Sequence, residues 1–148
     1  DVPVMLCFAD CASVVLACEG GFAVVHSGWR GTIGSIAGKA LGVLCEETGC
    51  EPGEVSCYVG PHIAGPDYEV SDELLRRFVA EFGECVIAGE RRLSLLEAIR
   101  SALVDAGADE AMIVDSGIST ATACDRYFSY RESGGKCGRH GAVAFMRR

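Results

Sequence analysis

The chain has 148 residues, of which 49% are hydrophobic and 23% are charged, so it can bury one good core but not comfortably two, and we expect a single domain over residues 1–148. The formal net charge of -8, without any run of Lys or Arg, argues against nucleic acid as a partner. No apolar stretch reaches the roughly eighteen residues of a membrane span and no signal-like leader is present, so we expect a soluble, cytoplasmic protein.

Three short apolar runs rich in β-branched residues begin the chain and predict strands at residues 2–8, 13–17 and 22–26. A break at residues 9–11 separates the first two strands, and the second and third form a hairpin. Apolar residues at helical spacing then predict a helix over residues 32–48 that packs on the sheet and ends at Gly49.

The second half continues the alternation of strands and helices. We expect a strand at 55–59, a shaped Gly- and Pro-rich loop at 60–66, a helix from the cap Ser71 to about Phe82, a helix at 93–105, a strand at 111–115, an extended segment at 128–131 and a closing strand at 142–146. Because a hairpin excludes a purely parallel sheet, the predicted fold class is α+β, a mixed β-sheet with helices packed against it.

Cysteine usage favours a reduced protein. Most of the cysteines lie in apolar runs, where Cys packs as a small hydrophobic residue. Their odd number and the absence of CxxC pairs argue against a disulfide scaffold. The nine are Cys7, Cys11, Cys18, Cys45, Cys50, Cys57, Cys85, Cys124 and Cys137.

The first candidate site combines Cys11, in Ala9-Asp10-Cys11, with His26 on the neighbouring hairpin strand. A thiolate and an imidazole form a ligand set for zinc or copper. Taken alone, a Cys before a strand and a His at the end of one are more often packing residues. Strand alternation places them on one face only if the break at Asp10 and Cys11 acts as a bulge.

Three arginines are candidates for binding an anion. Arg30 precedes a predicted helix start and can hold an oxyanion or pair with a surface carboxylate. Arg131 and Arg139 flank a glycine-rich turn after Phe128, where an aromatic face suits a purine and arginines suit phosphate, although an ordinary strand, turn and strand explains the segment equally well.

The two remaining histidines, His62 and His140, each stand beside glycine in a predicted loop. Either can serve as a ligand, but we expect both to be exposed loop residues.

Together these segments resemble the YfiH-type family, historically labelled polyphenol oxidases or laccases. The shared motifs are Ala-Asp-Cys at 9–11, His-x-Gly-Trp-Arg-Gly-Thr at 26–32, Gly-Pro-x-Ile-x-x-x-x-Tyr-Glu-Val at 60–70, and Phe-Ser-Tyr-Arg at 128–131 with Gly-Arg at 138–139. The resemblance implies a YfiH-like α+β fold and a zinc enzyme that phosphorolyses adenosine, inosine, guanosine and methylthioadenosine and deaminates adenosine. Purine nucleosides and phosphate are the partners it implies.

The resemblance also implies roles for individual residues. In the family a metal is held by a His, a Cys and a second His, and the latter two correspond to Cys11 and His26. The first His belongs to a segment upstream of residue 1, so the resemblance implies that the chain lacks the family's N-terminal segment. Arg30, with Arg131 or Arg139, would align phosphate, and Asp10 would orient the ligands or move a proton.

Several positions depart from the family pattern and bear on substrate preference. They are Ser13 for Pro, His62 for Cys, Ser94 and Ile99 in the Asp-Leu…Asn-Arg helix, Ser119 for Cys and Cys137 for Thr.

Three alternatives stay open beside the nucleoside enzyme. A copper-dependent polyphenol oxidase (laccase) would need several metal centres, for which three histidines are too few. A nucleoside-binding domain without turnover would keep the fold and the cleft. A cysteine hydrolase would use Cys11 as nucleophile and His26 as base.

Overall fold

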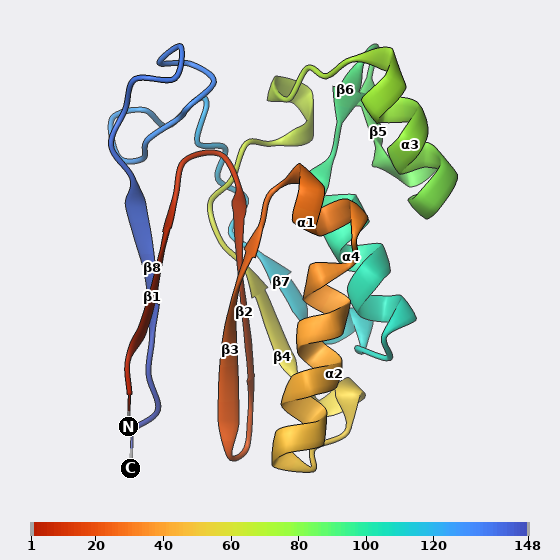
Figure 1. The fold of residues 1–148 in the computed structure, drawn as a ribbon, viewed down its shortest axis with the longest axis vertical. Coiled ribbons are helices and arrows are strands. Elements are labelled where there is room, and N and C mark those ends of the chain that lie inside the picture. The colour runs from red at the N-terminus through yellow and green to blue at the C-terminus, as the bar shows by residue number, and fades with distance from the viewer. Residues whose placement is uncertain (1, 148) are drawn as a thin grey trace.

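A computed structural model describes residues 2–147 and shows a mixed four-stranded sheet with helices on one face (Figure 1). The strand order is β3-β2-β4-β7, with β2 antiparallel to both neighbours and β4 parallel to β7. These strands are β2 (Ala12–Cys18), β3 (Gly21–Ser27), β4 (Ser56–Val59) and β7 (Ile113–Asp115). The mixed α+β prediction is therefore confirmed.

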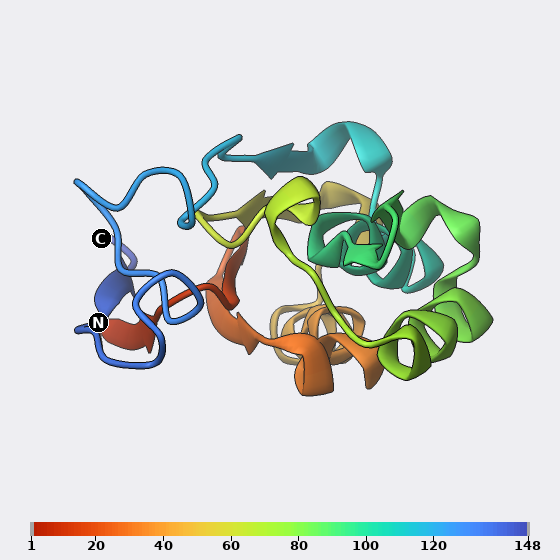
Figure 2. The ribbon, with the colours of Figure 1, turned by 90° about the horizontal axis from the view of Figure 1, so that it is seen from above.

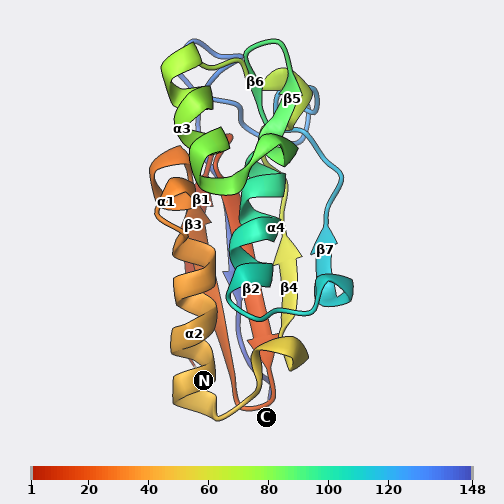
Figure 3. The same cartoon turned by 90° about the vertical axis from the view of Figure 1, so that its right-hand side faces the viewer.

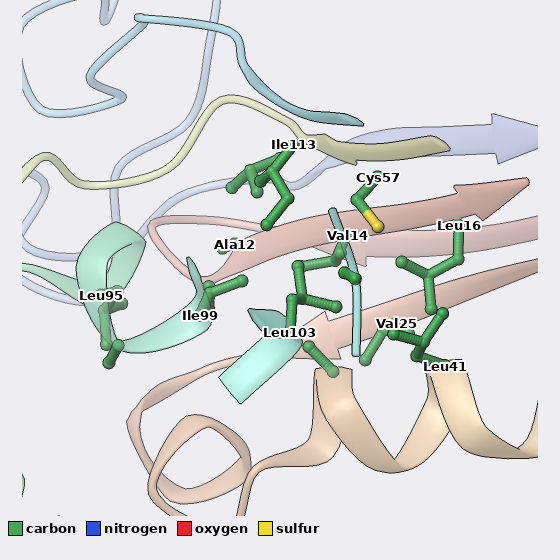
Figure 4. Packing of buried hydrophobic residues seen from close by; sticks show 14 of the residues in the cluster. Ala12, Val14, Leu16, Val25, Leu41, Cys57, Leu95, Ile99, Leu103 and Ile113 are labelled. Atoms are coloured by element: carbon green, nitrogen blue, oxygen red, sulfur yellow. The ribbon is translucent and has the colours of Figure 1, made fainter. Parts of the chain in front are cut away.

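Helices α2 (Ile36–Thr48) and α4 (Leu95–Asp105) lie against one face of the sheet (Figure 3). The side chains of β2 that point toward them, Ala12, Val14 and Leu16, are fully buried. They pack with residues such as Leu41 and Leu103 into a single core (Figure 4). Period-two burial along β2 and period-3.6 burial along the helices produce this core.

The first and last strands form a separate ribbon. β1 (Val4–Phe8) pairs antiparallel with β8 (His140–Ala144), from Val4 opposite Ala144 to Phe8 opposite His140. The ribbon lies on the side of the β2–β3 hairpin away from α2 and α4, and the two ends of the chain are neighbours (Figures 1 and 2). The predicted closing strand is thus confirmed, but it pairs with β1 in a separate two-stranded sheet.

The prediction of one continuous helix over residues 32–48 is wrong. The structure has α1 (Trp29–Ile33) and α2 (Ile36–Thr48), separated at Gly34 and Ser35. Ser35 adopts a left-handed φ of 53°, which no α-helix accommodates. The cap prediction at Ser71 is confirmed, because its side chain accepts a hydrogen bond from the Leu74 N–H at the start of α3 (Asp72–Phe82).

Two further expectations differ from the structure. Residues 87–93 form a small hairpin, β5 (Ile87–Gly89) and β6 (Arg92–Leu93), so α4 begins two residues later than predicted, after the cap Ser94. The segment at 128–131 is a turn rather than extended. Four short 3-10 helices complete the described elements: η1 (Pro52–Glu54), η2 (Gly65–Asp67), η3 (Glu84–Val86) and η4 (Glu110–Met112).

Candidate functional site

The turn between β1 and β2 brings Cys11 and His26 to one place. A Cβ built on Gly28 would lie 2.7 Å from Cys11 Sγ and 3.9 Å from His26 Nε2, so both donor atoms face this glycine. Asp10, with φ of 77°, lies in the left-handed region that Asp tolerates better than most residues. The β2–β3 pairing sets Ser13 opposite His26 without a bulge, so strand alternation places Cys11 and His26 on one face, as a metal site requires.

Asp10 holds three distant segments together through its carboxylate and its backbone carbonyl. Oδ1 accepts a 2.7 Å hydrogen bond from the Thr120 hydroxyl, and Oδ2 accepts a 2.7 Å bond from the Arg131 backbone N–H. The Asp10 carbonyl accepts a third bond, of 2.9 Å, from the Ile63 N–H. Because both carboxylate oxygens are engaged, Asp10 fixes the C-terminal loop over the Cys11–His26 pair.

The ionisable groups around Cys11 set its protonation. Burial raises the pKa of Cys11, the Asp10 carboxylate raises it further, and the nearby Arg139 guanidinium opposes both. Burial also lowers the pKa of His26. The imidazole is therefore neutral at neutral pH, which is the form that binds a metal.

An aromatic stack extends the site across the ribbon. The buried Phe8 ring stacks on His26, with centroids 4.8 Å apart, and on His140 at 6.4 Å. Tyr127 meets the His140 ring edge-on at 5.3 Å. The Phe128 N–H donates to His140 Nδ1 over 3.3 Å, so the neutral ring carries its proton on Nε2, which is buried without a partner among the described residues.

His140 is therefore a site residue that the sequence prediction placed wrongly. It was expected in an exposed loop, but it begins β8 and is half-buried opposite Phe8. Its position directly after the Gly138-Arg139 motif is the signal that points to it. Burial lowers the pKa of His140, and the Asp10 charge partly opposes this effect.

His62 is also misplaced by the sequence prediction. The side chain is 3% exposed, and its Nδ1 lies 2.9 Å from the Gly60 carbonyl oxygen. Its backbone pairs with Ser119, and its carbonyl accepts from the Thr120 N–H. His62 thus supports the loop that holds Thr120 against Asp10.

The predicted anion-binding residues do not form one cluster. Arg131 lies over the Tyr68 ring at 5.2 Å and donates to the Glu69 carbonyl over 2.7 Å. These three residues, together with Trp29 and Arg91, line a surface hollow of about 390 Å³.

Arg139 and Arg30 lie apart from this hollow. Arg139 donates to the Cys137 and Gly138 carbonyls at 3.0 and 2.8 Å, and its charge reaches Cys11. Arg30 lies within α1, exposed, with its guanidinium 4.2 Å from the centre of the Trp29 ring.

Phe128 is 44% exposed on the turn that carries Arg139, and a Cβ on Gly138 would lie 2.8 Å from its ring. Its aromatic face is therefore accessible beside the loop. No group of three or more His, Cys, Asp or Glu within residues 2–147 is arranged to hold a metal ion. Within the same residues, no helix is long and apolar enough to cross a membrane.

Comparisons with known proteins identify the family. The model of a family described as multi-copper polyphenol oxidoreductase laccase matches residues 1–147. The purine nucleoside phosphorylase YlmD of Bacillus subtilis is 29% identical over 147 residues, in a match that covers 94% of this chain and 53% of the relative. A purine nucleoside phosphorylase of Deinococcus radiodurans is 35% identical, with 91% and 53% covered, and the adenosine deaminase RL5 of an unknown prokaryote is 34% identical, with 88% and 53% covered.

Solved structures show the same fold. The hypothetical protein YfiH of Bacillus licheniformis superposes with a TM-score of 0.85 at 28% identity, covering 95% of this chain and 56% of that one. YlmD of Geobacillus stearothermophilus superposes with a TM-score of 0.86 at 28% identity, covering 96% and 56%. The chain spans about half the length of the curated relatives it matches. The chain belongs to the multi-copper polyphenol oxidoreductase laccase family, the YfiH-type proteins whose motifs its sequence carries.

Proposed function

We propose that the protein containing this chain is a purine nucleoside phosphorylase that also deaminates adenosine, with Cys11 and His26 as two ligands of a zinc ion. The observation that carries the proposal is the convergence of Cys11 Sγ and His26 Nε2 on Gly28. Relatives named purine nucleoside phosphorylase and adenosine deaminase support the choice of reaction.

The donor chemistry suits zinc. A thiolate with a neutral imidazole is a common part of a three-ligand zinc site, and a further donor from outside residues 2–147 would complete it. When bound, the ion would supply Lewis-acid polarisation and a lowered pKa of a bound water. His140 and the aromatic stack lie beside the pair, where they can orient a base.

The chain's own residues account for the other steps. In phosphorolysis a phosphate oxygen bonds to the ribose C1′ while the bond from C1′ to the purine nitrogen breaks. Arg139, whose charge reaches Cys11, is the best placed cation to hold that phosphate. We assign Asp10 a positioning role, because its two carboxylate oxygens are already bonded.

The test compares the full-length protein with a Gly28→Ala variant. The new Cβ would displace Cys11 Sγ without touching the core, so we expect loss of bound zinc and at least about a hundredfold loss of inosine phosphorolysis and adenosine deamination at an unchanged Tm. The matched control is Gly42→Ala, where nothing lies within 4 Å of the added atom. Metal is measured by elemental analysis and turnover by release of hypoxanthine and ammonia.

Each rival gives a different result. Full zinc and turnover in Gly28→Ala would refute the site. Bound copper with oxidation of a phenol would support the polyphenol oxidase. Hydrolysis that alkylation of Cys11 abolishes, whether or not zinc is present, would support the cysteine hydrolase, and nucleoside binding without product would support a binding domain.

A further inference from the structure

Three thiols gather at the end of the sheet far from the candidate site, where the β2–β3 hairpin meets the last turn of α2 (Figure 1). The Thr48 hydroxyl lies 3.4 Å from Cys18 Sγ and 3.0 Å from Cys50 Sγ. Cys50 Sγ in turn lies 3.8 Å from Cys45 Sγ. All three cysteines are free and half-buried, so small solutes can reach them.

The end of α2 produces this arrangement. Cys45 lies in the last turn of the helix, and its carbonyl accepts a 2.8 Å hydrogen bond from the N–H of Gly49. Gly49 adopts a left-handed φ of 76°, which reverses the chain and returns Cys50 to the side of Cys45. The two sulfurs are in van der Waals contact, from which rotation of the side chains can reach a disulfide.

The two thiols differ in reactivity. A hydrogen bond with Cys18, which has the larger effect, and one with Thr48 lower the pKa of Cys50. Burial and the hydrogen bond with Cys50 raise the pKa of Cys45 to about 11. Thr48 Oγ1 lies 2.7 Å from the Leu44 carbonyl oxygen and 3.0 Å from Cys50 Sγ. Its single hydroxyl proton can turn from the carbonyl toward a Cys50 thiolate. Cys50 is therefore the nucleophile and Cys45 its resolving partner.

We propose that Cys50 and Cys45 form a peroxide-oxidised dithiol, a modification site separate from the Cys11–His26 site. The Cys50 thiolate attacks a hydroperoxide, so that an S–O bond forms, the O–O bond breaks and an alcohol, or water from hydrogen peroxide, leaves. The Cys45 sulfur then attacks the sulfenic acid, forming the S–S bond and releasing water. In sum, two thiols and one hydroperoxide give one disulfide, one alcohol and one water.

Peptide mapping of the purified full chain tests the proposal. Glu46 and Glu47 lie between the two cysteines, so cleavage after glutamate separates their peptides unless a disulfide joins them. After hydrogen peroxide and alkylation, we expect the peptide ending at Glu46 to be linked to the peptide 48–54, because the Glu51–Pro52 bond resists cleavage, and we expect dithiothreitol to release it. Oxidation of Cys50 should be at least about tenfold faster than that of the exposed Cys85.

Variants separate the steps. In Cys45→Ser the sulfenic acid on Cys50 should persist and react with dimedone, and Cys85→Ser should behave as the wild type. Thr48→Val should shift the pH profile of Cys50 alkylation upward, because the thiolate loses a donor. A Cys50 that stays reduced, pairs with Cys18 or oxidises no faster than Cys85 would overturn the proposal. Nucleoside turnover is measured in parallel, and its absence does not bear on these outcomes.

Discussion

Removing the Asp10 carboxylate should destabilise the chain more than most single substitutions. In Asp10→Ala, the Thr120 hydroxyl and the Arg131 N–H both lose a charged acceptor. At about 1.5–3 kcal/mol for each such bond, with about 1 kcal/mol for Ala at a left-handed φ, we expect a loss of about 4–7 kcal/mol. Native proteins unfold at a cost of about 5–15 kcal/mol, so this loss is a large part of the total.

Asp10→Asn is the matched comparison. Asn tolerates the left-handed φ, its amide oxygen can accept from the Arg131 N–H, and its amide nitrogen can donate to the Thr120 oxygen. Two neutral bonds then replace two charged ones, at a cost of about 1–2 kcal/mol.

Thermal unfolding followed by circular dichroism measures both variants. For a chain of this size about 1 kcal/mol lowers Tm by about 2–4 °C, so Asp10→Ala should lose about 8–28 °C and Asp10→Asn about 2–8 °C. Limited digestion with trypsin after Arg131 should also accelerate in Asp10→Ala, because the loop loses its anchor. An Asp10→Ala protein within about 3 °C of the wild type would refute the reasoning.

Two further predictions concern the core. Gly38→Ala places a Cβ 2.5 Å from the Ala102 carbonyl oxygen, where α2 and α4 meet, and should lower the free energy of unfolding by about 1–3 kcal/mol. Gly42→Ala on the same helix meets nothing within 4 Å and should raise it by about 0.5–1 kcal/mol. Equal Tm values for the two variants would contradict this reasoning. Leu41→Ala, at a fully buried position, should cost about 2–5 kcal/mol in urea unfolding, against a change of less than about 0.5 kcal/mol for Val43→Ala, which is 58% exposed.

Local patterns predicted most of the regular elements. Short β-branched runs locate β2, β3 and β4, and a serine cap locates the start of α3, because these signals lie within a few neighbouring residues. The break inside residues 32–48 was missed, since Gly34 and Ser35 interrupt an otherwise helical spacing without a proline. The hairpin at 87–93 is short and stabilised mostly by its surroundings.

The candidate site was only partly predictable, because it depends on contacts between distant residues. The sequence prediction placed Cys11 and His26 on one face only with a bulge, whereas the observed register, with Ser13 opposite His26 and no bulge, places them there by simple alternation. His140 joins the site through strand pairing with Phe8, a register that no local pattern reveals. Arg30 was expected to act on phosphate together with Arg131 or Arg139, but the structure gives each of the three arginines its own surroundings.

The pairing of β1 with β8 has a consequence for synthesis on the ribosome. Ala144 is added to the growing chain long after its partner Val4. At about 5–20 residues per second, β1 waits roughly 7–28 s for β8. During that time it can pair with the same strand of another nascent chain, so misassembly during translation should begin at β1, and a chaperone that acts on this chain should bind there.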